Sequence, residues 1–114
     1  MSLSASAILA VSDLPIKSTN VPEWGGEVYY RAISLEELAK WEDGLSGKEL
    51  KPDQMMAQLL VLSLCDEGGL PLFKADDWKK LVGKNGLVLK RLYEEVCAIN
   101  GIGDVGRKVA QGNS

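Results

Sequence analysis

The stretch Val21-Pro22-Glu23-Trp24-Gly25-Gly26-Glu27-Val28-Tyr29-Tyr30-Arg31 is the one clear β-hairpin signal in a sequence that otherwise indicates helices. Gly25 and Gly26 predict a tight turn, because glycine adopts the positive φ angles that such turns need. The turn separates an extended segment over residues 14–21 from a returning strand over residues 27–33. A lone hairpin is marginal in water, so this one is expected to pack on helices or on another chain.

Two prolines place the first strand of the hairpin at the edge of its sheet. Pro15 and Pro22 have no backbone N–H to donate to a neighbouring strand. Trp24 lies beside the turn, where we expect a half-exposed ring rather than a deeply buried one.

Two helices are predicted on either side of the hairpin. Ser4 can cap a short helix that continues to Ala10. Ser34 and Glu37 have the spacing of a capping box, in which each side chain accepts a backbone N–H of the other residue. The helix that they open has an apolar stripe and is expected to end at Gly44 and the Ser46-Gly47 loop; the stripe comprises Leu35, Leu38, Trp41 and Leu45.

The most apolar helix is predicted next along the chain. Pro52 suits its first position, and from Met55 to Cys65 nine of eleven residues are apolar. A helix that is apolar on nearly all sides is expected to be the central buried element. Two readings stay open: its surface is covered entirely by this chain's own core, or part of it meets another subunit or a client.

Two further helices complete the predicted fold. After a turn over residues 66–69 and an extended return over 70–73, a helix is expected over 75–82. Asn85 can cap a last helix that ends at Asn100-Gly101, with one apolar face formed by Leu89, Leu92, Val96 and Ile99. The predicted class is α+β, mainly α, with an N-terminal β-hairpin packed on a small bundle of four to five helices. Residues 1–101 are expected to form one globular domain, and residues 102–114 a flexible glycine-rich tail.

The composition excludes several classes of function. The chain has 114 residues, of which 46% are hydrophobic and 25% charged, as in ordinary soluble domains. A net charge of -3 and a pI near 4.9 argue against nucleic-acid binding. The absence of histidine excludes Ser-His-Asp and Cys-His catalysis and removes the commonest metal ligand. The apolar run over residues 7–11 is too short to span a membrane and lacks a basic flank, so we expect a cytosolic protein.

No motif in the chain predicts a catalytic, cofactor or metal site. Residues 101–106 match the dinucleotide fingerprint letter for letter, but they follow a helix and leave only eight residues behind them. Asp66-Glu67 begins no calcium loop, since Gly68 and Leu70 stand where ligands are needed. Cys65 and Cys97 both lie in apolar runs predicted to be helical. A disulfide is formally possible, but two buried free thiols fit a reducing cytosol better.

Four segments in a fixed order carry a family resemblance. They are the hairpin at 21–26, the capped helix from Ser34, the run 62–73, and residues 89–93 leading to 99–101. Over about residues 3–101 the chain resembles the tail assembly chaperones of long, flexible-tailed (lambda-like or HK97-like) phages and prophages. Lys74-Ala75 departs from the pattern, because a Ser, Thr or Asp cap is expected there.

The resemblance implies a non-enzymatic assembly factor that needs no cofactor. Such a protein binds the tape measure protein, recruits the tail tube protein, and leaves before the virion is complete. It implies a homo-oligomer in the host cytoplasm, with no nucleic-acid or membrane partner. The glycine-rich end after Gly101 would suit a hinge to a longer, frameshifted product.

Apolar side chains near the hairpin and at the start of the central helix are candidate protein contacts. For each, packing within this domain is an equally open reading. The candidates are Val21, Trp24, Tyr29, Tyr30, Met55 and Met56. The alternatives to a chaperone are a structural virion component (a head–tail connector or tail subunit) and a small bacterial regulatory or adapter domain.

Overall fold

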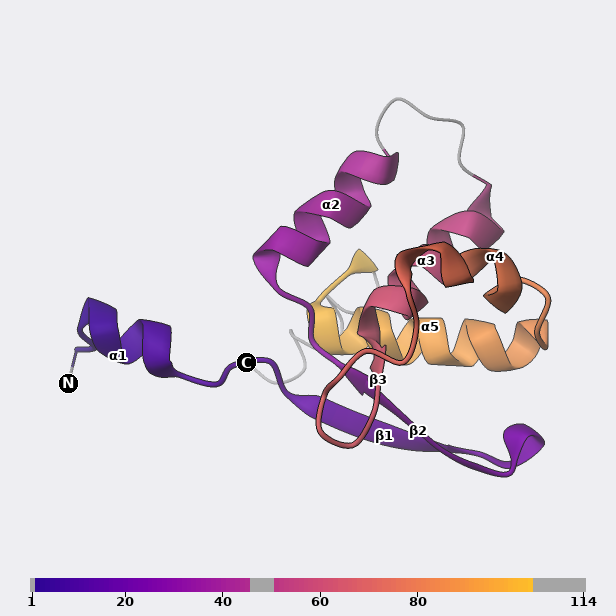
Figure 1. Cartoon of the computed structure of the whole chain (residues 1–114), viewed down its shortest axis with the longest axis horizontal. Coiled ribbons are helices and arrows are strands. Elements are labelled where there is room, and N and C mark those ends of the chain that lie inside the picture. The colour runs from indigo at the N-terminus through magenta and orange to yellow at the C-terminus, as the bar shows by residue number, and fades with distance from the viewer. Residues whose placement is uncertain (1, 46–50, 104–114) are drawn as a thin grey trace.

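The hairpin forms one side of the molecule. The structure, a computed structural model, describes residues 2–45 and 51–103 (Figure 1). Strand β1 (Ile16–Val21) pairs antiparallel with β2 (Gly26–Arg31), and Thr19 lies opposite Val28. The sheet order is β1-β2-β3, so β1 is an edge strand, as its prolines predict.

The turn of the hairpin differs from the prediction. Residues Pro22–Trp24 form one 3-10 turn (η1), and Gly25 follows it with a φ of 76°. Gly26 is already the first residue of β2 and has no positive φ. The expectation of positive φ angles at both glycines was wrong for Gly26, because the 3-10 turn reverses the chain with a single left-handed residue.

A third strand replaces the end of the predicted central helix. Helix α3 (Pro52–Ser63) ends before β3 (Leu64–Cys65), which pairs with β2 at Tyr30 and Tyr29. The helical prediction for residues 64 and 65 was therefore wrong. Pairing with β2 offers the backbone of these two residues strand hydrogen bonds that also cover the second edge of β2.

Helix α3 is the central element, as predicted. It contacts helices α2 (Leu35–Leu45), α4 (Trp78–Leu81) and α5 (Gly86–Asn100). Figure 1 shows α3 and α5 on the same side of the sheet. The core lies between these helices and the sheet, and its fully buried side chains include Val21, Leu59, Leu60, Leu64, Val88, Leu92 and Val96. The α+β, mainly α fold is thus confirmed.

The apolar stripe predicted for α2 is only partly buried. Trp41 is in the core, and its indole N–H donates to the Met55 carbonyl at 3.1 Å. Leu38 and Leu45 pack against the core, whereas Leu35 is 81% exposed. Leu35 is the first residue of α2. The loop predicted to follow α2 lies outside the described residues.

The turn and the first helix after β3 lie close to their predicted positions, although α4 ends at Leu81 and not at residue 82. Asp66 closes the turn after β3, since its Oδ1 accepts from the N–H groups of Gly68 and Leu70. The helix expected over 75–82 is a 3-10 turn, η2 (Ala75–Asp77), followed by α4. Asp77 Oδ2 accepts the Lys74 N–H at 2.9 Å, and so supplies the start signal that residues 74 and 75 lack.

Both ends of α5 confirm the prediction. Asn85 Oδ1 accepts from the N–H groups of Leu87 and Val88. Gly101 follows the helix in the left-handed conformation, with a φ of 65°. Ile102 still packs against the core, one residue past the expected end of the domain. Most of the predicted tail lies outside the described residues.

The N-terminal arm, defined as residues 2–14, extends away from the rest of the fold (Figure 1). It contains helix α1 (Ala5–Ala10), whose first turn is capped by Ser4 accepting the Ala7 N–H at 3.1 Å. The helix therefore begins and ends as its cap predicts. No residue of α1 is buried.

Candidate protein-contact surface

The six predicted contact residues differ in how far they are exposed. Val21 is 0% exposed and Tyr30 is 5% exposed, so both side chains belong to the core and offer a partner no surface. Trp24 is 40% exposed at the hairpin tip, as its position beside the turn predicts. Tyr29, Met55 and Met56 are half-buried. The structure thus leaves four of the six side chains within reach of another protein.

Trp24 forms one wall of an apolar hollow of about 490 Å³, which we call the Trp24 hollow. The hairpin tip contributes Trp24, the segment after β3 contributes Phe73, and α4 contributes Leu81. Asp77, Lys80 and Lys84 complete the lining. The hollow therefore has an apolar interior and a charged rim with two cations and one anion.

A second hollow, of about 130 Å³, adjoins the first and is called the Met56 hollow. Lys84 lines both hollows. The remaining lining comes from α3, from the end of α4 and from the start of α5, and comprises Asp53, Met56, Ala57, Leu60, Val82, Gly86 and Leu89. The structure thus brings Trp24 and Met56 to neighbouring parts of one surface, although they are far apart in the sequence.

An ion pair ties the hairpin tip to α5. Arg91 donates to both carboxylate oxygens of Glu23, at 3.1 and 3.2 Å. The Arg91 guanidinium lowers the pKa of the Glu23 carboxyl, and both groups are solvent-exposed. Glu23 directly precedes Trp24, so this pair helps to hold the indole over the hollow.

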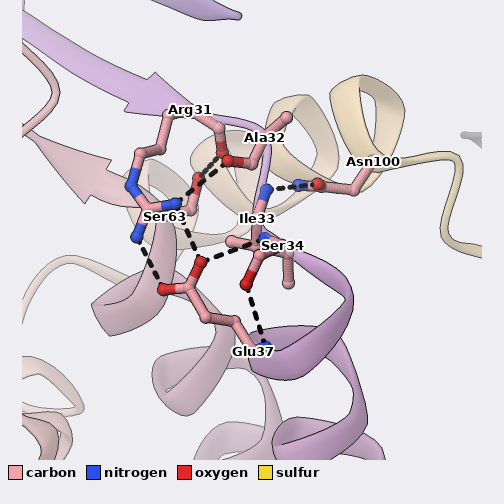
Figure 2. A network of polar contacts seen from close by, with 7 residues as sticks. All are labelled: Arg31, Ala32, Ile33, Ser34, Glu37, Ser63 and Asn100. Carbon is pink, nitrogen blue, oxygen red and sulfur yellow. Dashed lines mark hydrogen bonds and ion pairs between the residues drawn. The ribbon is translucent and has the colours of Figure 1, made fainter. Parts of the chain in front are cut away.

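A polar network joins the other end of the hairpin to three helices (Figure 2). Glu37 accepts two hydrogen bonds from the Arg31 guanidinium, at 2.9 and 2.6 Å. Glu37 also accepts the Ser34 N–H at 3.0 Å, while the Ser34 hydroxyl accepts the Glu37 N–H at 3.2 Å. The predicted capping box is therefore present, and its glutamate is also the partner of a strand arginine.

Two more side chains extend this network to α3 and α5. The hydroxyl of Ser63, a fully buried residue, donates to the Arg31 carbonyl at 2.7 Å. Asn100 Oδ1 accepts the Ile33 N–H at 2.8 Å, and its Nδ2 donates to the Val96 carbonyl at 2.9 Å. Figure 2 shows these bonds converging on the short connection between β2 and α2. The network fixes the direction in which α2 leaves the sheet.

The charges of the network stabilise each other. Hydrogen bonding from Arg31 holds the pKa of the Glu37 carboxyl below its usual value, despite opposing desolvation. The same hydrogen bonds raise the pKa of Arg31. Only 11% of the Arg31 side chain and 26% of the Glu37 side chain are exposed, so solvent screens this pair less than a surface ion pair.

The described residues contain no cluster of side chains that could hold a metal ion. No group of three potential metal-ligating side chains occurs in residues 2–45 and 51–103. Cys65 and Cys97 are free and buried, as expected for thiols rather than a disulfide, although Cys65 lies in β3 and not in a helix. Burial raises the pKa of both thiols, which keeps them protonated and unreactive at neutral pH. None of the described helices is both long and apolar enough to cross a bilayer.

Several residues of the surface were not found from the sequence. Phe73, Leu81 and Lys84 line the Trp24 hollow, but none of them was among the predicted contact residues. Asp77 has two roles, since it accepts the Lys74 N–H at the start of η2 and also lies on the rim of the hollow. The only local signal was the clustering of apolar residues with lysines between positions 73 and 84.

The comparison with known families settles the relationship of the chain. A family model described as phage tail assembly chaperone matches residues 3–105. The chain belongs to this family. The solved structure of the bacteriophage HK97 tail assembly chaperone is 25% identical in sequence and has a TM-score of 0.64, covering 82% of this chain and 88% of that chain. None of the curated protein sequences matches the chain.

Membership of the phage tail assembly chaperones confirms the resemblance seen in the sequence. The family match covers the N-terminal arm from residue 3 onward, the hairpin and all the described helices. The family is described as one of tail assembly chaperones. Both hollows therefore lie on a protein whose relatives act by contacting other proteins.

Proposed function

We propose that the chain is a tail assembly chaperone that binds the tape measure protein in the host cytoplasm and promotes assembly of the tail tube. The observation that carries this proposal is the family match over residues 3–105, supported by the structural similarity to the HK97 chaperone. In this proposal the chain also contacts the tail tube protein, acts without catalysis or cofactor, and is absent from the mature virion.

The Met56 hollow is the surface that best suits a client helix. Met56 offers a flexible, polarizable side chain that adapts to different apolar partners. Leu87 lies next to Gly86 in the wall and is 78% exposed, which adds apolar area beside the hollow. A long helical client presents apolar side chains at regular spacing, and such side chains can insert into a groove between helices.

The other candidate contacts have separate places in this proposal. Met55 is half-buried and directly precedes Met56, so it adds apolar area beside the client. Tyr29 is half-buried too, but its neighbour Tyr30 faces the core, so Tyr29 lies on the other face of the sheet and is a separate candidate contact. Val21 and Tyr30 act from the core by supporting the hairpin. Trp24 belongs to a contact between copies, since the chain is proposed to work as a homo-oligomer.

Co-purification with the tape measure protein of the same phage or prophage tests the proposal. A tagged chain is expected to retain the untagged tape measure protein, and Met56→Glu is expected to reduce the recovered client several-fold. Leu35→Glu is the matched control, because Leu35 is exposed and lines neither hollow. Absence of the client from the wild-type eluate would overturn the proposal.

Mass spectrometry of purified particles separates the chaperone from a structural virion component. The chaperone is expected in infected or induced cells but not in finished particles. Recovery of the chain at several copies per particle would instead support a head–tail connector or tail subunit.

A further inference from the structure

The N-terminal arm leaves its apolar side chains in solvent. Leu9 is 86% exposed, Leu3 is 66% exposed, and Ile8 and Val11 are each more than half exposed. Helix α1 has only six residues. Isolated helices shorter than roughly 12 residues are marginal in water, so α1 needs a packing partner to persist.

The arm leaves the fold in a defined direction. The Pro15 carbonyl accepts the Ala32 N–H at 3.0 Å, so pairing of the hairpin continues to the residue next to the arm. Leu14 precedes Pro15 and is therefore restricted to extended backbone. Figure 1 shows the arm pointing away from the hairpin tip.

The Trp24 hollow lies at the opposite end of the hairpin. The six residues of β1 separate the arm from the tip by about 20 Å. The five residues from Val11 to Pro15 reach about 17 Å when fully extended. To reach its own hollow, α1 would have to fold back along β1 on a taut linker. A second copy of the chain meets no such restriction.

The chemistry of the arm fits the Trp24 hollow. The hollow offers Trp24, Phe73 and Leu81 as apolar walls, with Lys80 and Lys84 on its rim. Residues 2–12 contain no charged side chain, and Asp13 follows them. Docking of the arm therefore places apolar side chains in the hollow and the Asp13 carboxylate near the two lysines. The arm adds no cationic side chain that would repel these lysines.

We infer that α1 of one copy docks in the Trp24 hollow of a second copy. This inference rests on the self-association included in the proposed function, and it assigns the surfaces that make the contact. The contact joins two different surfaces, so each copy both donates an arm and accepts one.

Two complementary variants test this contact with the purified chain and no client. Leu9→Asp disables the arm, and Trp24→Asp disables the hollow; both side chains are exposed, so the fold is expected to persist. Light scattering after size exclusion is expected to show an associated wild type and two monomeric variants. An equimolar mixture of the variants is expected to form only a two-chain complex, because each supplies one intact surface. Leu35→Asp is the control and is expected to associate like the wild type.

Cysteine cross-linking locates the contact directly. A chain with Leu9→Cys, mixed with a chain with Lys84→Cys and oxidised, is expected to give a disulfide-linked dimer, while Leu35→Cys with Lys84→Cys gives none. The native thiols are buried and add little background. A wild type that is monomeric at every concentration would overturn the inference. Association that survives both Leu9→Asp and Trp24→Asp would also overturn it, while leaving self-association and client binding in place.

Discussion

At the scale of single residues, Glu37 has two structural roles, one in capping a helix and one in pairing with a strand arginine. It completes the capping box at the start of α2 and accepts two hydrogen bonds from Arg31 of β2. A change at this position therefore affects the helix terminus and the link between helix and sheet together. Hydrogen bonds to charged groups are worth about 1.5–3 kcal/mol each, so the position is expected to matter for stability.

Glu37→Gln is expected to lower the free energy of unfolding by about 1–2 kcal/mol at pH 7, because it keeps the shape and the cap but removes the charge. The pKa of Glu37 is lowered in the folded state. Its contribution is thus fully present above the unfolded pKa, about 4.3, and is lost as the pH falls through the lower folded value. Urea unfolding at a series of pH values measures this difference.

The matched control for this prediction is Glu36→Gln. Glu36 is one residue away, its side chain is 81% exposed, and its ion pair with Lys40 spans 3.9 Å. The control is expected to change stability by no more than about 0.5 kcal/mol. A difference between Glu37→Gln and the wild type that stays constant from pH 7 to pH 3 would contradict the assigned role of the charge.

At the scale of elements, the two ends of α5 show opposite uses of glycine. Gly101 has a φ of 65°, which an alanine adopts only with strain, whereas Gly86 is helical and has open space around its Cα. Gly101→Ala is expected to destabilise the protein by about 1 kcal/mol. Gly86→Ala is expected to be neutral or to stabilise it by up to about 1 kcal/mol. Thermal unfolding of the pair gives the test, and equal shifts for both variants would speak against it.

The elements that were predicted correctly have strong local signals. Ser4, Ser34, Pro52, Asn85 and Gly101 each mark a helix end through their own backbone or side-chain chemistry, and each is found in that role. The hairpin likewise follows from β-rich residues around a glycine-containing turn. Local chemistry of this kind is visible in the sequence because its partners are only a few residues apart.

The elements that were missed depend on partners far away in the chain. Leu64 and Cys65 form a strand because β2, more than 30 residues earlier, has a free edge beside them. Leu35 matches a helical stripe but is exposed, since the placement of α2 depends on the network around Arg31 and Asn100. The Trp24 hollow combines residues from the hairpin, α4 and the segment between them. Contacts between residues far apart in the sequence cannot be predicted from hydrophobic periodicity or from the spacing of motifs.

At the scale of the whole molecule, the two buried thiols report on the integrity of the core. Cys65 lies in the sheet and Cys97 in α5, and burial raises the pKa of each. Neither is expected to react with a thiol reagent at neutral pH until the protein unfolds. The reaction rate followed against urea concentration should therefore track the unfolding transition. Fast labelling of either cysteine in the native protein would show that the core opens locally.

Three surfaces of the molecule are assigned to two different kinds of protein contact. The arm and the Trp24 hollow lie at opposite ends of the hairpin, and the Met56 hollow adjoins the Trp24 hollow across Lys84. In the proposed function, copies join through the first two surfaces and present the third to the client. Self-association and client binding are thus expected to be separable, with Leu9→Asp affecting the former and Met56→Glu the latter.

The most direct test is the yield of soluble tape measure protein when it is expressed with and without this chain. Co-expression with the wild type is expected to increase the soluble fraction several-fold, with Leu35→Glu equal to the wild type and Met56→Glu well below it. A soluble yield that does not change on co-expression with the wild-type chain would contradict the proposed chaperone function.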